Sequence, residues 1–279
     1  MRTDLAVESF GNERLPEGVH RHIRGRCFDI TEIVIDDDRC ADAVGKGKGR
    51  YITLETGHLS RFSDEYEAMT EELSGELSRL IPEGDVLVVG LGNNDITPDS
   101  LGPRTAARVI ATRHLRDELG EDEDFLLSLR RVSTIAGGVM GQTGIETAEI
   151  VRALVGQLQP VAVIAVDALA CSDVSRLGTA IQLTDTGISP GSGVSNARKE
   201  LSCRNLGIPV IAVGVPTVVD MHTIVRSLTE AEIPDDTPNM IVTPRDIDRL
   251  AERAAQLIAF GINLALHPSL SFDDVRGLF

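Results

Sequence analysis

The sequence predicts an α/β protein built on a mostly parallel sheet flanked by helices. From residue 86 onward, short runs rich in β-branched residues alternate with segments of helical periodicity, the pattern of βαβ units. Aromatic residues are scarce, with no Trp and two Tyr, so Val, Ile, Leu and Ala must build the core, as in a buried parallel sheet. The apolar runs are VLVVG at 86–90, VAVIAV at 161–166, TAIQLT at 179–184 and PVIAVGV at 209–215.

The first 80 residues predict less regular structure. Residues 1–28 show no periodicity and are expected to form an irregular N-terminal arm. Apolar and polar residues alternate at 31–35 and 50–55, which predicts a half-exposed pair of edge strands. Apolar residues at helical spacing predict a helix over 63–80, with Ser63 as its cap.

Three further helices are expected at 103–119, at 145–158 and from Thr243 onward. The last has the clearest start, because Thr243 suits the cap position and Pro244 the first turn. No internal repeat or long low-complexity segment interrupts the chain. We therefore expect one α/β domain over 1–279, in which the acidic run 121–124 is a solvated loop.

Composition excludes several classes of protein. With 27 Lys and Arg against 43 Asp and Glu, the net charge of −16 argues against direct binding of nucleic acid, which depends on clustered basic residues. No secretory signal follows Met1, and no apolar run approaches the roughly 20 residues of a membrane helix. The four Cys form no C-x-x-C pair, which speaks against a disulfide scaffold. A cytoplasmic protein without a membrane partner is expected.

Two aspartates are the leading catalytic candidates. Asp99 follows the run at 86–90, and Asp167 interrupts the run that begins at 161. Catalytic groups gather at the carboxyl ends of parallel strands, where two carboxyl groups can separate their pKa values and activate water. A structural role, in which Asp99 caps the N-terminus of a helix ahead of Pro103, explains this residue equally well. A structural role is less favoured for Asp167, because an unpaired buried carboxylate is costly.

A glycine-rich loop at 137–147 (GGVMGQTGIET) precedes a predicted helix. Its backbone amides could face an anion or a substrate chain, and a tight strand-to-helix turn explains the same residues. The loop and the segment before Asp99 supply candidates for stabilising an oxyanion. These candidates are Asn93, Thr97, Gly138, Gly141 and Thr143.

Other motifs are incomplete. A dinucleotide fingerprint that begins at Gly90 lacks its third glycine, because Asp95 stands there. The G-x-S-x-G pattern at 187–191 places Pro190 where a serine hydrolase needs a backbone N–H. His20 and His22 lack ligand-like spacing to another histidine. We expect no tightly bound metal and no cofactor, although a divalent metal between the two aspartates stays open.

Seven segments in chain order form a longer pattern. They are RTDLAVE from Arg2, GRYITLE from Gly49, LGNNDITPDSLGP from Leu91, GGVMGQTGIET from Gly137, VDALA from Val166, LTDTGISPGSGVSNARKELS from Leu183 and LGIPVIAVGVPTVVD from Leu206. This series resembles the germination protease family, endopeptidases that degrade small acid-soluble spore proteins when bacterial spores germinate. The resemblance implies a fold similar to that of hydrogenase-maturation proteases. It also implies that the essential aspartates of the TPD and VDAL motifs correspond to Asp99 and Asp167.

The resemblance further implies a zymogen that cleaves itself after an acidic residue that precedes an aliphatic one. Asp4 and Leu5 match that pattern, which predicts a pro-segment of residues 1–4. A homotetramer in the cytoplasm of the spore core is implied as well, with small acid-soluble spore proteins as substrates.

In the expected mechanism, one aspartate acts as general base toward water. The other, kept protonated by its neighbour's charge, polarises the scissile carbonyl or protonates the leaving amine. The residues leave open which does which. Two alternatives remain: a metal-dependent maturation-type peptidase of the same fold, and a non-catalytic module that binds a phosphorylated ligand through the glycine-rich loop.

Overall fold

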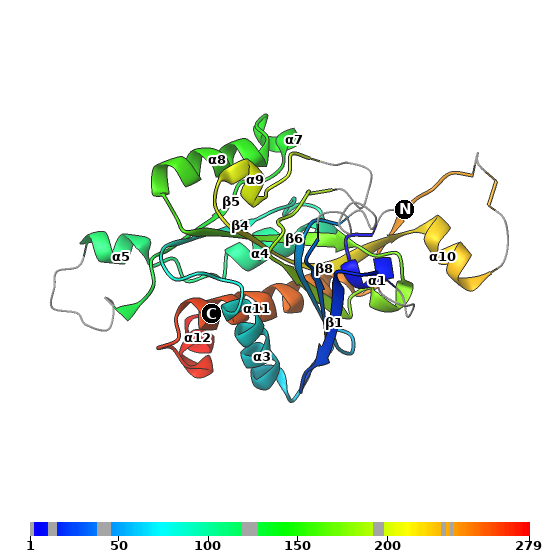
Figure 1. The fold of residues 1–279 in the computed structure, drawn as a ribbon, viewed down its shortest axis with the longest axis horizontal. Coiled ribbons are helices and arrows are strands. Elements are labelled where there is room, and N and C mark those ends of the chain that lie inside the picture. Colours follow the sequence, from blue (N-terminus) through cyan, green and yellow to red (C-terminus); the bar gives the residue numbers. More distant parts are fainter. Residues whose placement is uncertain are drawn as a thin grey trace.

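The computed structural model describes residues 3–10, 16–37, 46–118, 128–191, 198–229, 233–234 and 237–279. Within these residues, a nine-stranded sheet runs through the centre and helices cover both of its faces (Figure 1). The predicted α/β class is confirmed.

The sheet has a parallel half and an antiparallel half. In spatial order its strands are β1 (Val19–Arg24), β2 (Asp29–Ile35), β3 (Gly49–Glu55), β7 (Ala180–Thr184), β8 (Val210–Asp220), β6 (Ala162–Ala170), β4 (Val86–Gly90) and β5 (Val132–Ala136), while β9 (Ile241–Val242) pairs with β8. Strands β8, β6, β4 and β5 are parallel to one another. The remaining pairs are antiparallel. The predicted strand runs from residue 86 onward are therefore all found in one mixed sheet.

Successive residues of the central strands face opposite layers. Val86 and Val88 of β4 pack in the cluster formed with α3 (Tyr66–Ser78), α4 (Leu101–Ala106) and α11 (Ile247–Leu266). Leu87 and Val89 pack against α8 (Thr147–Leu158) on the other face. Burial on both faces explains why these strands are continuous apolar runs.

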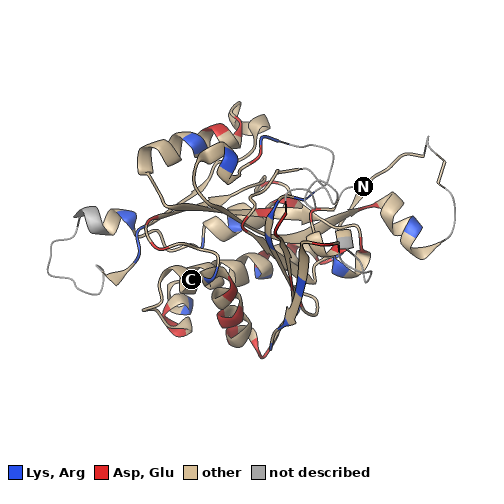
Figure 2. Cartoon of the chain, viewed as in Figure 1, with Lys and Arg blue, Asp and Glu red and all other residues tan. Residues whose placement is uncertain are grey.

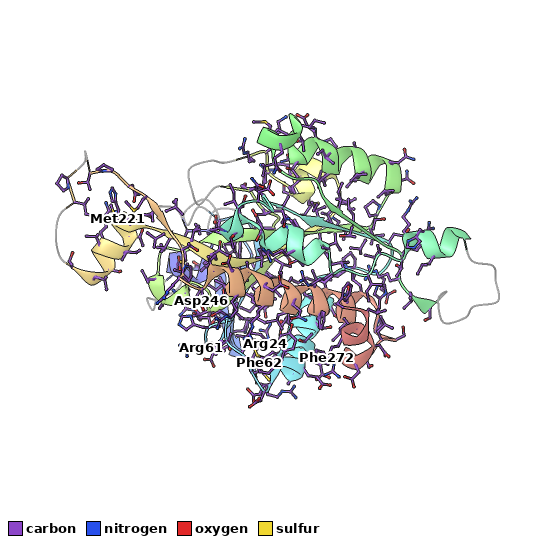
Figure 3. All side chains as sticks on the ribbon, turned by 180° about the vertical axis from the view of Figure 1, so that it is seen from behind. Arg24, Arg61, Phe62, Met221, Asp246 and Phe272 are labelled. Atoms are coloured by element: carbon purple, nitrogen blue, oxygen red, sulfur yellow. The ribbon has the colours of Figure 1, made fainter. Side chains whose placement is uncertain are left out.

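The shorter helices lie around this core. They are α1 (Ala6–Phe10), α5 (Arg113–Glu118), α7 (Met140–Thr143), α9 (Cys203–Leu206), α10 (Met221–Leu228) and α12 (Phe272–Leu278), with 3-10 turns η1 (Thr97–Asp99) and η2 (Val174–Arg176). Figure 3 shows Phe272 of α12 beside α11, and Met221 at the start of the projecting helix α10. Acidic residues gather on α3 (Figure 2). Among the described residues, no helix has both the length and the apolar character needed to cross a bilayer.

Two predictions for the N-terminal region are wrong. The expected irregular arm over 1–28 contains α1 and β1. Strand β1 is an edge strand with the sequence VHRHIR, and all of its residues except Val19 are partly or fully exposed. No apolar alternation therefore marks it in the sequence. The strands at 31–35 and 50–55 do pair with each other, as predicted, but the pair does not lie at the edge of the sheet, since β1 pairs with β2 on one side and β7 pairs with β3 on the other.

Helix boundaries also differ from the prediction. The helix expected over 103–119 is split into α4 and α5, because Thr112 leaves the helical path to bond with the start of β5: its N–H donates to Val132 O at 3.1 Å. Helix α11 begins at Ile247 because the Thr243 hydroxyl donates to Thr217 O at 2.9 Å, which holds Thr243 against β8. The acidic run 121–124 lies outside the described residues.

Candidate active site

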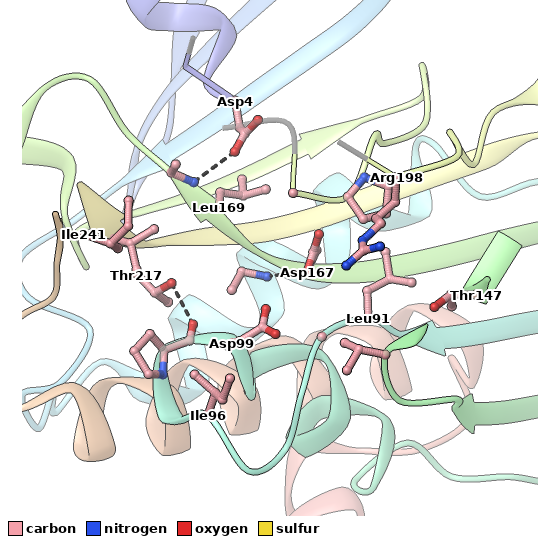
Figure 4. Close-up of a pocket in the computed structure, with 18 of the residues that line it drawn as sticks. Asp4, Leu91, Ile96, Asp99, Thr147, Asp167, Leu169, Arg198, Thr217 and Ile241 are labelled. Atoms are coloured by element: carbon pink, nitrogen blue, oxygen red, sulfur yellow. Dashed lines mark hydrogen bonds between the residues drawn. The ribbon is translucent and has the colours of Figure 1, made fainter. Parts of the chain in front are cut away.

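Two carboxyl groups meet at the carboxyl edge of the parallel strands. Asp167 lies within β6, and Asp99 ends the η1 turn that follows β4. The two strands are parallel neighbours, with Gly90 paired to Val166. Asp99 and Asp167 both line a cavity of about 350 Å³, into which their side chains point (Figure 4). The structure therefore brings together the two residues selected from the sequence.

Several contacts hold Asp99 in place. The Asn93 N–H donates to Asp99 Oδ2 at 2.8 Å, and the Thr217 hydroxyl donates to Pro98 O at 2.8 Å, which ties η1 to β8. Gly92 has a φ of +103°, and a Cβ there would lie 2.1 Å from Asp99 O. The residue before α4 is Ser100, and it makes no side-chain cap. Asp99 is therefore not the helix cap considered above.

The surroundings of the two carboxyl groups differ. Asp167 is 4% exposed, and its Oδ1 accepts the Ala168 N–H at 2.9 Å. Burial, and next the negative charge of Asp99, raise the pKa of Asp167 well above its usual range. Burial also raises the pKa of Asp99, but the bond from the Asn93 N–H opposes that shift. Protonation is therefore favoured more strongly at Asp167 than at Asp99.

Among the described residues, the remaining walls are mainly apolar, with Glu146 as a further acid and Arg198 as a cation. Ile96, Met140 and Ile241 line the cavity and are 53%, 40% and 52% exposed. The Arg198 side chain extends into the same space (Figure 4). Arg198 was not among the predicted site residues. It belongs to the motif that begins at Leu183, but it lies in an irregular segment where no periodicity indicates which way a side chain points.

The five residues predicted to stabilise an oxyanion do not line this cavity; Val139 and Met140 of the glycine-rich loop do. Asn93 uses its side-chain oxygen to accept from Gln142 Nε2 at 2.9 Å. The Thr143 hydroxyl donates to Ile145 O at 3.0 Å. These side chains stabilise the loops around the site. Thr97, Gly138 and Gly141 also lie outside the cavity wall.

The N-terminal segment reaches the same cavity. Asp4 lines it, and the Ala170 N–H donates to Asp4 Oδ2 at 2.9 Å. The Asp4 N–H donates to Ala170 O at 3.2 Å, so the segment lies against the end of β6. Leu5 is completely buried. Asp4 of the predicted self-cleavage bond thus lines the cavity that also contains the two aspartates.

Other candidate groups lie in different surroundings. His20 and His22 belong to β1, which β2, β3, β7 and β8 separate from β6. Burial, together with the charge of Glu8, raises the pKa of the Cys171 thiol to about 12, so it is a poor nucleophile. Within the described ranges, no three His, Cys, Asp or Glu side chains are grouped as metal ligands.

An α/β sheet with two carboxyl groups of unequal proton affinity at its strand ends has the elements of a hydrolase that activates water. The germination protease family model matches residues 18–233. The chain belongs to the germination protease family and is a peptidase.

Curated germination proteases align with this chain over nearly the whole length of both proteins. A germination protease of Caldanaerobacter subterraneus subsp. tengcongensis is 39% identical, with 100% of this chain and 98% of the relative covered. A germination protease of Clostridium acetobutylicum is 36% identical, with 99% of this chain and 98% of the relative covered. Among solved structures, a [NiFe] hydrogenase maturation protease HycI from Thermococcus kodakarensis KOD1 matches at 19% identity with a TM-score of 0.35, covering 66% of this chain and 96% of that one. That likeness is too slight to support an argument.

Proposed function

We propose that this peptidase is an endopeptidase that starts the degradation of small acid-soluble spore proteins during spore germination, with water activated by Asp99 and Asp167. One observation carries the proposal: the two carboxyl groups share a cavity, and their surroundings separate their proton affinities. The family to which the chain belongs supports the choice of substrate.

In the proposed mechanism, Asp99 is the general base and Asp167 the general acid. Asp99 is the better candidate for the ionised form, because it accepts the Asn93 N–H and is only half-buried, whereas Asp167 is 4% exposed. It takes a proton from water, and the water oxygen bonds to the scissile carbonyl carbon. Asp167, whose pKa is raised by burial and by the charge of Asp99, gives its proton to the leaving nitrogen as the carbon–nitrogen bond breaks.

The same site is proposed to process its own chain. Cleavage between Asp4 and Leu5 would remove residues 1–4, and the position of Asp4 in the cavity wall supports that choice of bond. The exposed apolar residues around the cavity suit the aliphatic residue of a substrate. A net charge of −16 suits an enzyme that digests DNA-associated proteins without itself competing for DNA. Location in the spore core and assembly as a homotetramer belong to the same proposal.

Mass spectrometry of the purified chain, alone and with a small acid-soluble spore protein, tests the proposal. Asp95→Asn is the matched control, because Asp95 is an exposed acid in the same loop. The wild type and this control are expected to lose residues 1–4 and to cleave the substrate after acidic residues. Asp99→Asn and Asp167→Asn are each expected to cleave about 10²–10⁴-fold more slowly.

Two other outcomes assign a different function. Loss of cleavage on adding a chelator, restored by a divalent metal, would make this a metal-dependent peptidase of the maturation type. Absence of cleavage in every variant, with a melting temperature raised by inorganic phosphate, would favour the phosphate-binding module. Wild-type rates in both aspartate variants would refute the assignment of the site.

A further inference from the structure

A lysine contacts the carbonyl oxygen of the proposed self-cleavage bond. Lys46 lines a second cavity, of about 640 Å³, which shares Asp4 and Leu169 with the cavity of the two aspartates. The Lys46 ammonium donates to Thr3 O at 2.8 Å and to Asp4 O at 3.1 Å. The Asp4 carbonyl belongs to the peptide bond that is proposed to break.

The polar groups of this bond and of Asp4 all have partners. Both the N–H and the carboxylate of Asp4 bond to the backbone of Ala170, as described above. The Leu5 N–H, which becomes the leaving amine, donates to Thr3 Oγ1 at 3.0 Å. Lys46 supplies the partner of the carbonyl oxygen. That oxygen is the atom on which negative charge develops when water adds to the carbonyl carbon.

We propose that Lys46 is a further catalytic residue of self-cleavage, holding residues 3 and 4 by their carbonyl oxygens and stabilising the oxyanion formed at Asp4. The inference rests on the proposed self-processing. Water adds to the Asp4 carbonyl carbon and loses a proton to the general base. The Asp4–Leu5 bond then breaks, and the general acid protonates the Leu5 nitrogen. Lys46 keeps its proton throughout, so it acts by charge and hydrogen bonding alone.

The surroundings of Lys46 suit this role. The residue is half-buried, and a charge-assisted hydrogen bond is stronger where water is partly excluded. Burial lowers the pKa of Lys46, while the charges of Asp4 and Glu8 oppose that shift. The contacts are to main-chain oxygens, so they do not depend on the side chains of the bound segment.

The test compares self-cleavage rates of four proteins by mass spectrometry. Lys46→Met keeps the length of the side chain and removes the charge, whereas Lys46→Arg keeps the charge. Lys48→Met is the matched control, because Lys48 is an exposed lysine of the same loop. Lys46→Met is expected to cleave itself about 10²–10³-fold more slowly, the usual effect of removing one oxyanion donor. Lys46→Arg is expected to recover most of the rate, and Lys48→Met to match the wild type.

The outcomes separate this inference from the proposed function. If the wild type cleaves itself and Lys46→Met is within threefold of it, the role of Lys46 is refuted and self-processing stands. No cleavage in the wild type would refute self-processing and this inference with it. If Lys46→Met does not fold, Lys46→Ala is assayed with added propylammonium. A rate that rises with the amine supports the role of the ammonium, and a rate that does not rise overturns it.

Discussion

Gly92 is predicted to be essential for the position of Asp99, and Gly92→Ala tests that dependence. The backbone at Gly92 has a φ of +103°, and an added Cβ would lie 2.1 Å from Asp99 O and 2.9 Å from Asp99 Oδ1. A left-handed conformation costs an L residue about 1–2 kcal/mol, and overpacking costs about 1–3 kcal/mol more. The free energy of unfolding should therefore fall by about 2–5 kcal/mol. If Asp99 shifts by about 1 Å to relieve the contact, cleavage should slow by about 10²-fold.

The assay measures urea unfolding and peptide cleavage on the same protein. Gly144→Ala is the control for backbone strain, because Gly144 has a φ of +71° and open space around the added Cβ. It should lose about 1 kcal/mol of stability and cleave at the wild-type rate. Gly156→Ala, in an exposed position of α8 with open space, should gain about 1 kcal/mol. A Gly92→Ala protein with wild-type cleavage, or an equal loss of rate in Gly144→Ala, would refute the reasoning.

Three further predictions concern stability. Phe260→Ala should lower the free energy of unfolding, measured in urea, by about 3–5 kcal/mol, because Phe260 is 1% exposed and packs edge-on against two other rings. A decrease of less than about 1 kcal/mol would contradict this packing. Burial raises the pKa of Asp167, so the folded state retains a proton that the unfolded chain releases, and stability should fall as pH rises from about 4 toward the raised pKa. Asp167→Asn removes this dependence, so its melting temperature should exceed that of the wild type by a margin that grows with pH; a constant margin between pH 4 and 8 contradicts the shift. Arg24→Met should lower the free energy of unfolding by about 3 kcal/mol, because Arg24 pairs with the largely buried carboxylates of Glu32 and Glu76. An unchanged urea midpoint would contradict this and show that Arg79 alone is enough to neutralise both carboxylates.

The central strands and the aspartate pair were predictable from the sequence. Strands β4, β6, β7 and β8 are apolar runs because both of their faces are buried, and such runs are visible without knowledge of their partners. Asp99 and Asp167 stood out because parallel strands place their carboxyl ends at one edge. The roles of these two residues remain a proposal.

Long-range partners were not predictable in the same way. Strand β1 is defined by its pairing with β2 and not by its own residues, and α11 begins where it does because Thr243 bonds to Thr217. Periodicity indicates which face of an element is buried, but not which distant residue it meets.

The same distinction applies to the site. The sequence by itself determined the α/β class and the two acidic residues, because local pattern and strand direction are properties of short segments. Only the tertiary structure decided that Arg198 extends into the cavity and that Lys46 contacts the Asp4 carbonyl. These contacts join segments far apart in the chain, and their positions depend on the packing of the whole sheet and its loops.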